Sequence, residues 1–209
     1  MRARLETGAQ RGPGRETGRE PEREPGREAP VGECRQGLAP IIGGQPRLLI
    51  LGSMPGLASL RQQQYYGHPR NAFWPIMCHL LGLPAAADYA RRTRALVAHG
   101  IALWDVIAAC ERQGSLDQAI RPDSIQVNDF VALFAAWPGI ARIAFNGATA
   151  EREFQRRVLP LLAPAQQRLP RLRLPSTSPA HAARTLAEKL AAWRVILPAL
   201  ADTDAGGND

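Results

Sequence analysis

Apolar residues fall into short runs along most of the chain, and stretches with helical spacing separate these runs. The clearest run is Leu48–Leu51, four consecutive aliphatic residues that are typical of a strand covered on both faces. Comparable patterns predict strands at 48–51, 101–104, 140–145 and 172–174, helices at 71–83, 86–99, 129–137, 148–161 and 182–197, and a polar connection at 109–129. Because strands alternate with helices, we expect an α/β fold: a three-layer α/β/α sandwich with a mainly parallel central sheet.

The two ends of the chain differ from its middle. Residues 1–38 contain eight Arg and seven Glu among Gly and Pro, with almost no large apolar side chain. Such a segment cannot bury enough apolar surface to offset the entropy that is lost on ordering. We therefore expect a disordered tail at 1–40, one folded domain at 41–200 and a disordered C-terminus at 201–209.

The tail lacks the apolar core of a secretory signal, and no later stretch is long enough to span a membrane. We expect a cytoplasmic monomer that does not bind membranes. The three cysteines, Cys34, Cys78 and Cys110, are widely spaced and form no Cys-x-x-Cys pattern. This usage indicates a reducing compartment, no disulfide framework and no structural zinc site.

The chain is basic, with a net charge of +7, and this charge favours polyanionic partners such as nucleic acids. Many basic proteins bind no nucleic acid, so charge alone decides little. Of the 26 basic residues only Lys189 is a lysine. A mechanism through a lysine Schiff base would therefore have to use Lys189, which lies in a stretch typical of a C-terminal surface helix.

Polar or turn-forming segments follow three of the predicted strands. These are Gly52–Gly56 after the first strand, Asp105 after the second and Ser176–His181 after the last. In open α/β sheets, ligands bind outside the carboxyl ends of the strands. The hydroxyl side chains of the last segment suit a loop that holds a phosphate, although a helix N-cap and turn is the simpler interpretation. The sequence contains neither the phosphate-loop nor the dinucleotide-binding fingerprint.

Several motifs in the same order resemble the uracil-DNA glycosylase superfamily. Gly52-Ser-Met-Pro-Gly56 and His68-Pro-Arg-Asn71-Ala-Phe-Trp74 resemble the Gly-x-Asn-Pro-Gly turn and the His-Pro-x-Asn-x-Phe-Trp motif of its mismatch-specific members. Leu103–Val106, Phe145–Gly147 and Leu174–Ala180 resemble the hypoxanthine-DNA glycosylase branch, which acts on deoxyinosine. The resemblance implies the α/β fold of that superfamily and DNA as the partner.

The chain departs from the family pattern at three positions. Uracil-excising relatives have an Asn or Asp that positions or activates water where this chain has Met54, whose thioether can do neither. Ser176 stands where many relatives have His or Asn, and His181 replaces the usual Asn after Ser-Pro-Ala. The resemblance implies that water positioning passes to Asn71. Met54 thus argues against efficient removal of uracil.

The resemblance also implies roles for other residues of these motifs. Tyr66 aligns with the aromatic residue that stacks on the extruded base, which leaves Tyr65 for packing. Asn71 would orient water, and Asp105 would assist electrostatically. The implied contacts to the base are Ser53, Met54, Pro55, Gly56, Tyr66 and His68, and those to DNA are Ser176, Thr177, Ser178, Pro179 and His181.

Each role has a simpler structural alternative. Asn71 could cap the following helix, Asp105 could bind backbone N–H groups at the strand end, and His68 could fix its own loop. Phe73 and Trp74 have the spacing of core residues. Four arginines are candidates for phosphate contacts if they lie at the rim of the site: Arg61, Arg70, Arg142 and Arg184.

The sequence favours a monofunctional DNA glycosylase that removes a deaminated base, hypoxanthine first, and leaves an abasic site. The alternatives are a uracil or G:U mismatch glycosylase, a nucleic-acid-binding module without catalysis and a small-molecule hydrolase on the same scaffold. We expect no cofactor and no metal, since iron–sulfur members of the superfamily need four cysteine ligands and three scattered cysteines do not suffice.

Overall fold

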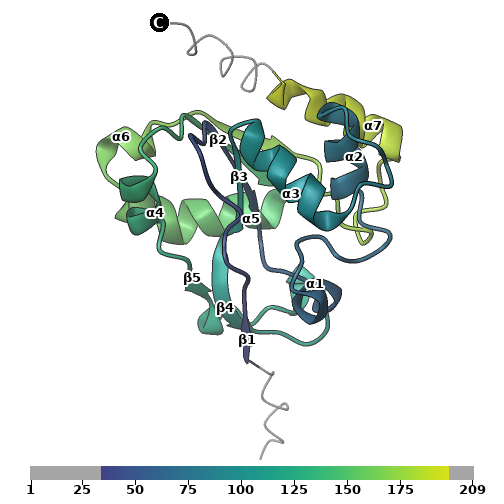
Figure 1. Ribbon diagram of the computed structural model, residues 1–209. Helices are drawn as coiled ribbons and strands as arrows, with labels where there is room; N and C mark the ends of the chain where they lie inside the picture. The colour runs from purple at the N-terminus through teal and green to yellow at the C-terminus, as the bar shows by residue number, and fades with distance from the viewer. Residues whose placement is uncertain (1–33, 198–209) are drawn as a thin grey trace, which may run out of the picture. The chain divides into compact units, whose positions relative to one another are not determined.

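The structure, a computed structural model, describes residues 34–197. Its centre is a parallel sheet of four strands in the order β3-β2-β6-β7 (Figure 1). The strands are β2 (Leu48–Gly52), β3 (Ile101–Asp105), β6 (Arg142–Asn146) and β7 (Arg171–Leu174). All four strands therefore end at the same edge of the sheet, as the alternation of strands and helices predicted.

Strand β2 lies in the interior of the sheet, and its side chains contribute to a hydrophobic core on each face of the sheet. Leu48 pairs with Ile101 on one side and with Arg142 on the other. Because successive side chains of a strand point to opposite faces, Leu48 and Ile50 pack on one face while Leu49 and Leu51 pack on the other. All four leucine and isoleucine side chains at 48–51 are buried, as their composition predicted.

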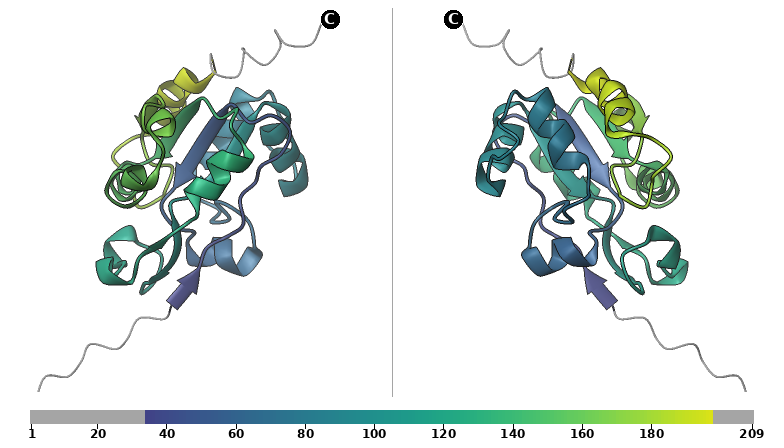
Figure 2. Two further views of the ribbon diagram at one scale, coloured as in Figure 1. Left: turned by 90° about the vertical axis from the view of Figure 1, so that its left-hand side faces the viewer. Right: turned by 90° about the vertical axis from the view of Figure 1, so that its right-hand side faces the viewer.

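Helices cover both faces of this sheet (Figure 2). On one face lie α2 (Phe73–Leu80), α3 (Tyr89–Ala98) and α7 (Leu186–Trp193). On the other lie α4 (Phe130–Ala136) and α5 (Ala148–Glu153), which continues into a π-helical turn at Phe154–Val158. The layers confirm the α/β/α sandwich.

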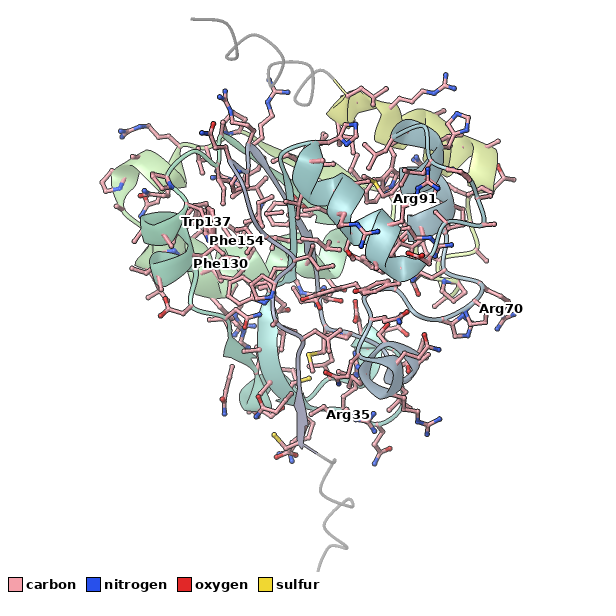
Figure 3. The ribbon with its side chains drawn as sticks, in the orientation of Figure 1. Arg35, Arg70, Arg91, Phe130, Trp137 and Phe154 are labelled. Atoms are coloured by element: carbon pink, nitrogen blue, oxygen red, sulfur yellow. The ribbon has the colours of Figure 1, made fainter. Side chains whose placement is uncertain are left out.

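Aromatic side chains fill the space between α4 and the π-helical turn. The Phe130 and Phe154 rings meet edge to face with centroids 5.3 Å apart (Figure 3). The predicted helix at 148–161 is not continuous, because Pro160 cannot donate a backbone hydrogen bond and the chain tightens into a 3₁₀ turn at Leu159–Leu161. The remaining short helix on this part of the chain is α6 (Pro164–Gln167).

A small antiparallel sheet, in the order β1-β4-β5, was not predicted. Its strands are β1 (Cys34–Gln36), β4 (Ile107–Glu111) and β5 (Gln126–Val127). Strand β4 follows β3 after a single residue, Val106, and β5 lies in the segment that was read as a connection. Strand β1 lies within residues 1–40, which were assigned to the tail. These strands are short and pair with distant segments, so local periodicity does not reveal them.

Helix boundaries also differ from expectation. Helix α1 (Leu57–Gln62) lies in a segment for which no element was predicted, directly after the turn at Gly52–Gly56, and α7 starts at Leu186 because Thr185 and Glu188 form a capping box. The predicted C-terminus at 201–209 lies outside the described residues. Within 34–197, no helix has the length and apolar character needed to cross a membrane.

Candidate active site

A cleft of about 1220 Å³ opens at the carboxyl ends of the four parallel strands. Turns from β2, β3, β6 and β7 line it, together with the loops around Tyr66 and Ser115. The cleft thus lies where open α/β sheets bind ligands. All of the residues predicted to contact base or DNA, or to act in catalysis, line this cleft: Ser53, Met54, Pro55, Gly56, Tyr66, His68, Asn71, Asp105, Ser176, Thr177, Ser178, Pro179 and His181.

The candidate phosphate contacts divide into two pairs. Arg70 and Arg184 are exposed and line the cleft, and Arg70 projects outward from its loop (Figure 3). Arg61 and Arg142 are also exposed but are not among the lining residues. Arg142 is the first residue of β6, so it lies at the opposite end of the sheet from the cleft. Of these four arginines, Arg70 and Arg184 are therefore the ones placed to contact DNA bound there.

Gly52 ends β2 directly against Asp105, the last residue of β3. A Cβ atom on Gly52 would lie 2.1 Å from the Asp105 Oδ1 atom and 3.1 Å from the Tyr66 hydroxyl. Real Cβ atoms do not approach other atoms so closely, so this position requires glycine because of the contact rather than the backbone conformation. The missing side chain brings a carboxyl and a phenol group to one point at the end of the sheet.

The Asp105 side chain is buried without a partner. It is 3% exposed, and neither of its carboxyl oxygens forms a hydrogen bond with another described residue. The side chain of Asn128 donates to the backbone carbonyl of Asp105 at 2.8 Å, not to its carboxyl. The alternative role, a carboxylate bonded to backbone N–H groups, is therefore not what the structure contains.

Burial raises the pKa of Asp105 to about 8, and the negative charge of Asp117 adds to this rise while the Arg112 guanidinium opposes it. At neutral pH the carboxyl is therefore mostly protonated. Burial and Asp105 also raise the pKa of Tyr66, so its hydroxyl keeps its proton throughout the physiological range. Two neutral acid groups thus lie together at the floor of the cleft.

The two adjacent tyrosines have different surroundings. Tyr65 is 2% exposed, its hydroxyl donates to the backbone carbonyls of Leu38 and Ala39 at 3.1 Å, and Trp74 Nε1 donates to its carbonyl at 2.7 Å. Tyr65 is a packing residue. Tyr66 has the left-handed backbone conformation, with φ of 54°, which costs free energy for a bulky residue.

The ring of Tyr66 is held by a second aromatic ring. It stacks on Phe73, which is fully buried, with centroids 3.9 Å apart and an angle of 24° between the planes. No described residue forms a well-aligned hydrogen bond with the Tyr66 hydroxyl, although the Asn146 side chain lies near enough to lower its pKa. Phe73 therefore fixes the plane of Tyr66 from behind, and its own place in the core agrees with the predicted helical spacing.

Asn71 lies just before helix α2. Its side-chain oxygen accepts from the Phe73 N–H at 3.0 Å, and its own N–H donates to the His68 carbonyl at 2.8 Å. The N-cap residue of α2 is Ala72, so Asn71 instead forms an Asx turn just before the helix that satisfies the Phe73 N–H. An amide oxygen can accept a second hydrogen bond, and the Nδ2 atom donates to no described residue, so Asn71 retains groups that can bind water.

His68 also has both a structural contact and a free atom. Its Nδ1 atom accepts from the Arg70 N–H at 3.1 Å, which fixes the loop as the simpler alternative proposed. In the neutral ring this contact leaves the proton on Nε2. His68 can therefore donate one hydrogen bond into the cleft.

The loop after β7 is fixed by Asn146 and Gly147. Thr177, fully buried, donates its N–H to Asn146 Oδ1 and accepts from Asn146 Nδ2, both at 2.8 Å. The Thr177 carbonyl accepts from the Ala72 N–H at 3.0 Å. Gly147 has φ of 102°, and a Cβ there would lie 3.0 Å from Ser176 Cβ. Asn146 and Gly147, which end the Phe145–Gly147 motif, thus fix the last loop, and Thr177 of that loop contacts the segment before α2.

Helix α7 holds both ends of that same loop. Trp193 Nε1 donates to the Pro175 carbonyl at 3.0 Å, and Lys189 Nζ donates to the His181 carbonyl at 2.9 Å. Lys189 is 5% exposed and does not line the cleft. The only lysine of the chain is therefore a structural residue, on a helix that was predicted to lie at the surface.

Three functional-site residues were missed in the segment read as a polar connection. Arg112, fully buried, donates to the carbonyls of Met54 and Pro55, and Asp117 accepts a hydrogen bond from the Ser53 hydroxyl at 2.8 Å to each carboxylate oxygen. Ser115 accepts from the Leu57 N–H at 3.0 Å. The sequence did contain a signal for them, because this charged and polar segment follows the predicted strand at 101–104, which ends at the edge of the sheet where the cleft opens.

Met54 has a different place from its neighbours in the turn. It is 6% exposed, and its side chain packs with Ile107, Cys110 and Ile120 in the small core beneath the antiparallel sheet. The thioether thus has a hydrophobic role here, and the backbone is what Met54 can offer to a ligand. Among the described residues no group of three or more His, Cys, Asp or Glu could hold a metal ion.

Comparison with known proteins agrees with this geometry. Residues 40–200 match the family described as the Uracil DNA glycosylase superfamily. A protein of Methanosarcina barkeri named hypoxanthine DNA glycosylase is 39% identical over 114 residues, which are 54% of this chain and 71% of that protein. A protein of Methanosarcina acetivorans with the same name is 38% identical over 118 residues, which are 56% of this chain and 73% of that protein.

A solved structure shows the same relation in three dimensions. The solution NMR structure of a Methanosarcina acetivorans protein, described as a candidate uracil DNA glycosylase, has a TM-score of 0.63 and 32% identity to this chain. The similarity covers 79% of this chain and 99% of that one. The chain therefore belongs to the uracil-DNA glycosylase superfamily.

Proposed function

We propose that this protein is a monofunctional DNA glycosylase of base-excision repair that hydrolyses the N-glycosidic bond of a deaminated base, hypoxanthine in deoxyinosine. The observation that carries this proposal is the cleft at the strand ends, which Tyr66, Asn71 and Asp105 all line. Two relatives that are 38–39% identical bear the name hypoxanthine DNA glycosylase. Met54 supports hypoxanthine over uracil, because its side chain is buried and cannot activate water.

The enzyme binds a nucleotide that has left the base stack, because the bond to be broken is inaccessible within a duplex. The extruded base lies on the Tyr66 ring, which Phe73 holds in place. Backbone groups of the turn at 53–56 and the Nε2 atom of His68 contact its polar edge. Arg70, Arg184 and the hydroxyl loop at 176–178 hold the flanking phosphates.

Cleavage gives the sugar oxocarbenium character while the base leaves with electrons from the broken bond. Asn71 orients a water molecule toward C1′ through the amide groups that its contact with the Phe73 N–H leaves free. The strand-end amides near Ser53 stabilise charge on the base. Lys189 is bonded to the His181 carbonyl outside the cleft, so no lysine forms a Schiff base and the abasic product is not cleaved by the enzyme.

The test is a panel of identical duplexes that carry deoxyinosine, deoxyuridine or deoxyadenosine, treated with alkali after incubation to cut at abasic sites. We expect cutting of the deoxyinosine strand, at least tenfold slower cutting of the deoxyuridine strand and none for deoxyadenosine. Without alkali the deoxyinosine strand stays intact. Faster loss of uracil would favour the alternative of a uracil or mismatch glycosylase, and loss of neither base would favour the binding module.

Asn71→Ser separates the two roles of Asn71. A serine hydroxyl can form the same kind of turn with the Phe73 N–H but cannot place its oxygen where the longer amide does. We expect Asn71→Ser to fold and bind DNA like the natural protein and to excise at least about 100-fold more slowly. Near-normal excision by this variant would show that Asn71 only forms this turn.

We also infer that the enzyme acts as a monomer, because the cleft takes all its predicted site residues from one chain. Gel filtration at the concentration of the excision assay tests this, and a dimer there would contradict it. Its cytoplasmic location stays a prediction.

A further inference from the structure

The floor of the cleft contains two buried polar groups, the Asp105 carboxyl and the Tyr66 hydroxyl, that the described residues do not fully satisfy. Both groups are enclosed; among the described residues the Asp105 Oδ2 atom has no hydrogen-bond partner, and the Tyr66 hydroxyl has only the nearby Asn146 side chain. Both groups reach the space beside Gly52, since a Cβ atom there would lie 2.1 Å from Asp105 Oδ1 and 3.1 Å from the Tyr66 hydroxyl. An unsatisfied buried polar group costs about 1–3 kcal/mol, so a partner from outside the protein, a water molecule or a ligand, is expected to complete the Asp105 carboxyl.

The charges around Asp105 come from several elements. Asp117 on the loop after β4 raises its pKa, and the Arg112 guanidinium on the same loop lowers it. Tyr65 and Tyr66, from the loop after α1, are the other titratable groups that interact with its charge. Arg112 is already bonded to the carbonyls of Met54 and Pro55, so no cation pairs directly with the Asp105 carboxyl. Its surroundings therefore favour the form that carries a proton.

We propose that Asp105 is the general acid of this enzyme and donates its carboxyl proton to a ring nitrogen of the departing purine. This inference rests on the proposed function. It assigns a proton-transfer role to the partnerless carboxyl and makes purines, rather than pyrimidines, the substrate class.

The step balances as a hydrolysis. The bond between N9 and C1′ breaks and its electron pair moves into the base, while the proton of Asp105 adds to N7 or N3 of the purine. The base thus leaves as neutral hypoxanthine. Water adds to C1′ through its oxygen, and the proton that this water loses returns to the Asp105 carboxylate. The enzyme ends the cycle in its starting protonation state.

General acid catalysis also explains why a purine would be selected. A purine has N7 and N3 as proton acceptors beside the bond that breaks, whereas uracil has no imidazole nitrogen. An acid matched to the operating pH contributes about 10²–10⁴-fold to rate. A base that cannot take up this proton is therefore released more slowly by that factor.

The experiment combines a variant with altered substrates under single-turnover conditions. Asp105→Asn has the same shape and breaks no hydrogen bond of the carboxyl, so it should fold, which a thermal melt checks. The substrates are duplexes with deoxyinosine, 7-deaza-deoxyinosine or 3-deaza-deoxyinosine, in which carbon replaces one acceptor nitrogen. Asp123→Asn, which removes an exposed carboxylate outside the cleft, is the control and should excise normally.

We expect Asp105→Asn to excise hypoxanthine at least about 100-fold more slowly. The natural enzyme should lose a similar factor on the analogue that lacks the proton acceptor. The variant should lose little more on that analogue, because the variant and the analogue remove the same proton transfer. The excision rate of the natural enzyme should also fall as pH rises through about 8, and Asp105→Asn should lack this fall.

Three results have different meanings. If the losses from Asp105→Asn and from both analogues multiply, Asp105 does not protonate the base and this inference is wrong. If Asp105→Asn excises at the natural rate, it is also wrong. If the natural protein releases no hypoxanthine at all, the proposed function itself fails, and the two failures are thereby distinguished.

Discussion

At the scale of single residues, the candidate site is distinguished by a buried polar group without a hydrogen-bond partner within residues 34–197 and by a strained backbone. Among the described residues no group forms a hydrogen bond with the buried Asp105 carboxyl, and Tyr66 has a strained backbone. Both features cost stability, and natural proteins retain such costs at functional sites. Asn71 differs, because its contact with the Phe73 N–H explains its position just before α2, and a catalytic role must use its remaining hydrogen-bonding groups.

The carboxyl of Asp105 should make stability depend on pH. Burial raises its pKa from the usual value near 4 to about 8, so between these values the folded state keeps a proton that the unfolded chain has lost. The free energy of unfolding therefore decreases as pH rises from 4 to 8. Asp105→Asn should be more stable by about 1–3 kcal/mol at pH 8, with a difference that disappears toward pH 4.

Urea unfolding at pH 4, 6 and 8 measures this difference. Identical pH profiles for the natural protein and Asp105→Asn would show that the folded protein does not hold the proton. Asp123→Asn, an exposed carboxylate, should leave the profile unchanged.

Gly52 should tolerate no side chain. In Gly52→Ala the new Cβ meets the Asp105 carboxyl at 2.1 Å, so strand β2 or β3 must shift. We expect a loss of about 2 kcal/mol in the free energy of unfolding and loss of excision. Gly139→Ala is the control, since its Cβ would meet only the Pro46 carbonyl, at 3.5 Å. Equal stability of the two variants in urea would contradict the close contact.

At the scale of elements, contacts between distant loops shape the cleft. Helix α7 holds the loop after β7 through Trp193 and Lys189, and the loop after β4 holds the turn after β2 through Arg112 and Asp117. The strands and most helices follow from local periodicity. The small sheet and these loop contacts do not, because they join residues that lie far apart in sequence.

The contact between β6 and the last loop can be tested with Thr177→Val, which keeps the size of the side chain but removes the acceptor for Asn146 Nδ2. We expect the free energy of unfolding to fall by about 1–3 kcal/mol, because a half-buried amide loses its partner. DNA binding should weaken too, since this loop lines the cleft. In a double-mutant cycle with Asn146→Ala the losses should not add, and additive losses would contradict the contact.

At the scale of the whole molecule, the net charge of +7 suits a polyanionic substrate, but the position of each charge decides its effect. Arg70 and Arg184 line the cleft, whereas Arg142 begins β6 at the far end of the sheet. Sequence reasoning treated the three alike, because the charge of a residue does not reveal which end of a strand it will occupy.

The salt dependence of DNA binding separates these arginines. A phosphate contact releases counterions, so Arg70→Ala and Arg184→Ala should each weaken binding and reduce the slope of log affinity against log salt by about 1. Arg142→Ala should leave the slope unchanged. Fluorescence anisotropy with a labelled duplex at several salt concentrations gives these slopes, and a reduced slope for Arg142→Ala would refute the assigned binding face.

The sequence by itself determined the layered fold and the edge of the sheet at which the motifs meet. Runs such as Leu48–Leu51 mark buried strands through composition alone, and turn residues after Gly52, Asp105 and Leu174 follow those strands in the chain. Local order therefore sufficed to gather the predicted site residues at one cleft.

Only the tertiary structure decided the protonation state of Asp105 in that cleft. The isolation of Asp105 depends on Gly52, Tyr66 and Arg112, which come from three other parts of the chain. Burial, and the pKa that follows from it, is a property of all the atoms that exclude water from a group. No pattern of neighbouring residues could have predicted it, because those atoms become neighbours only when the chain has folded.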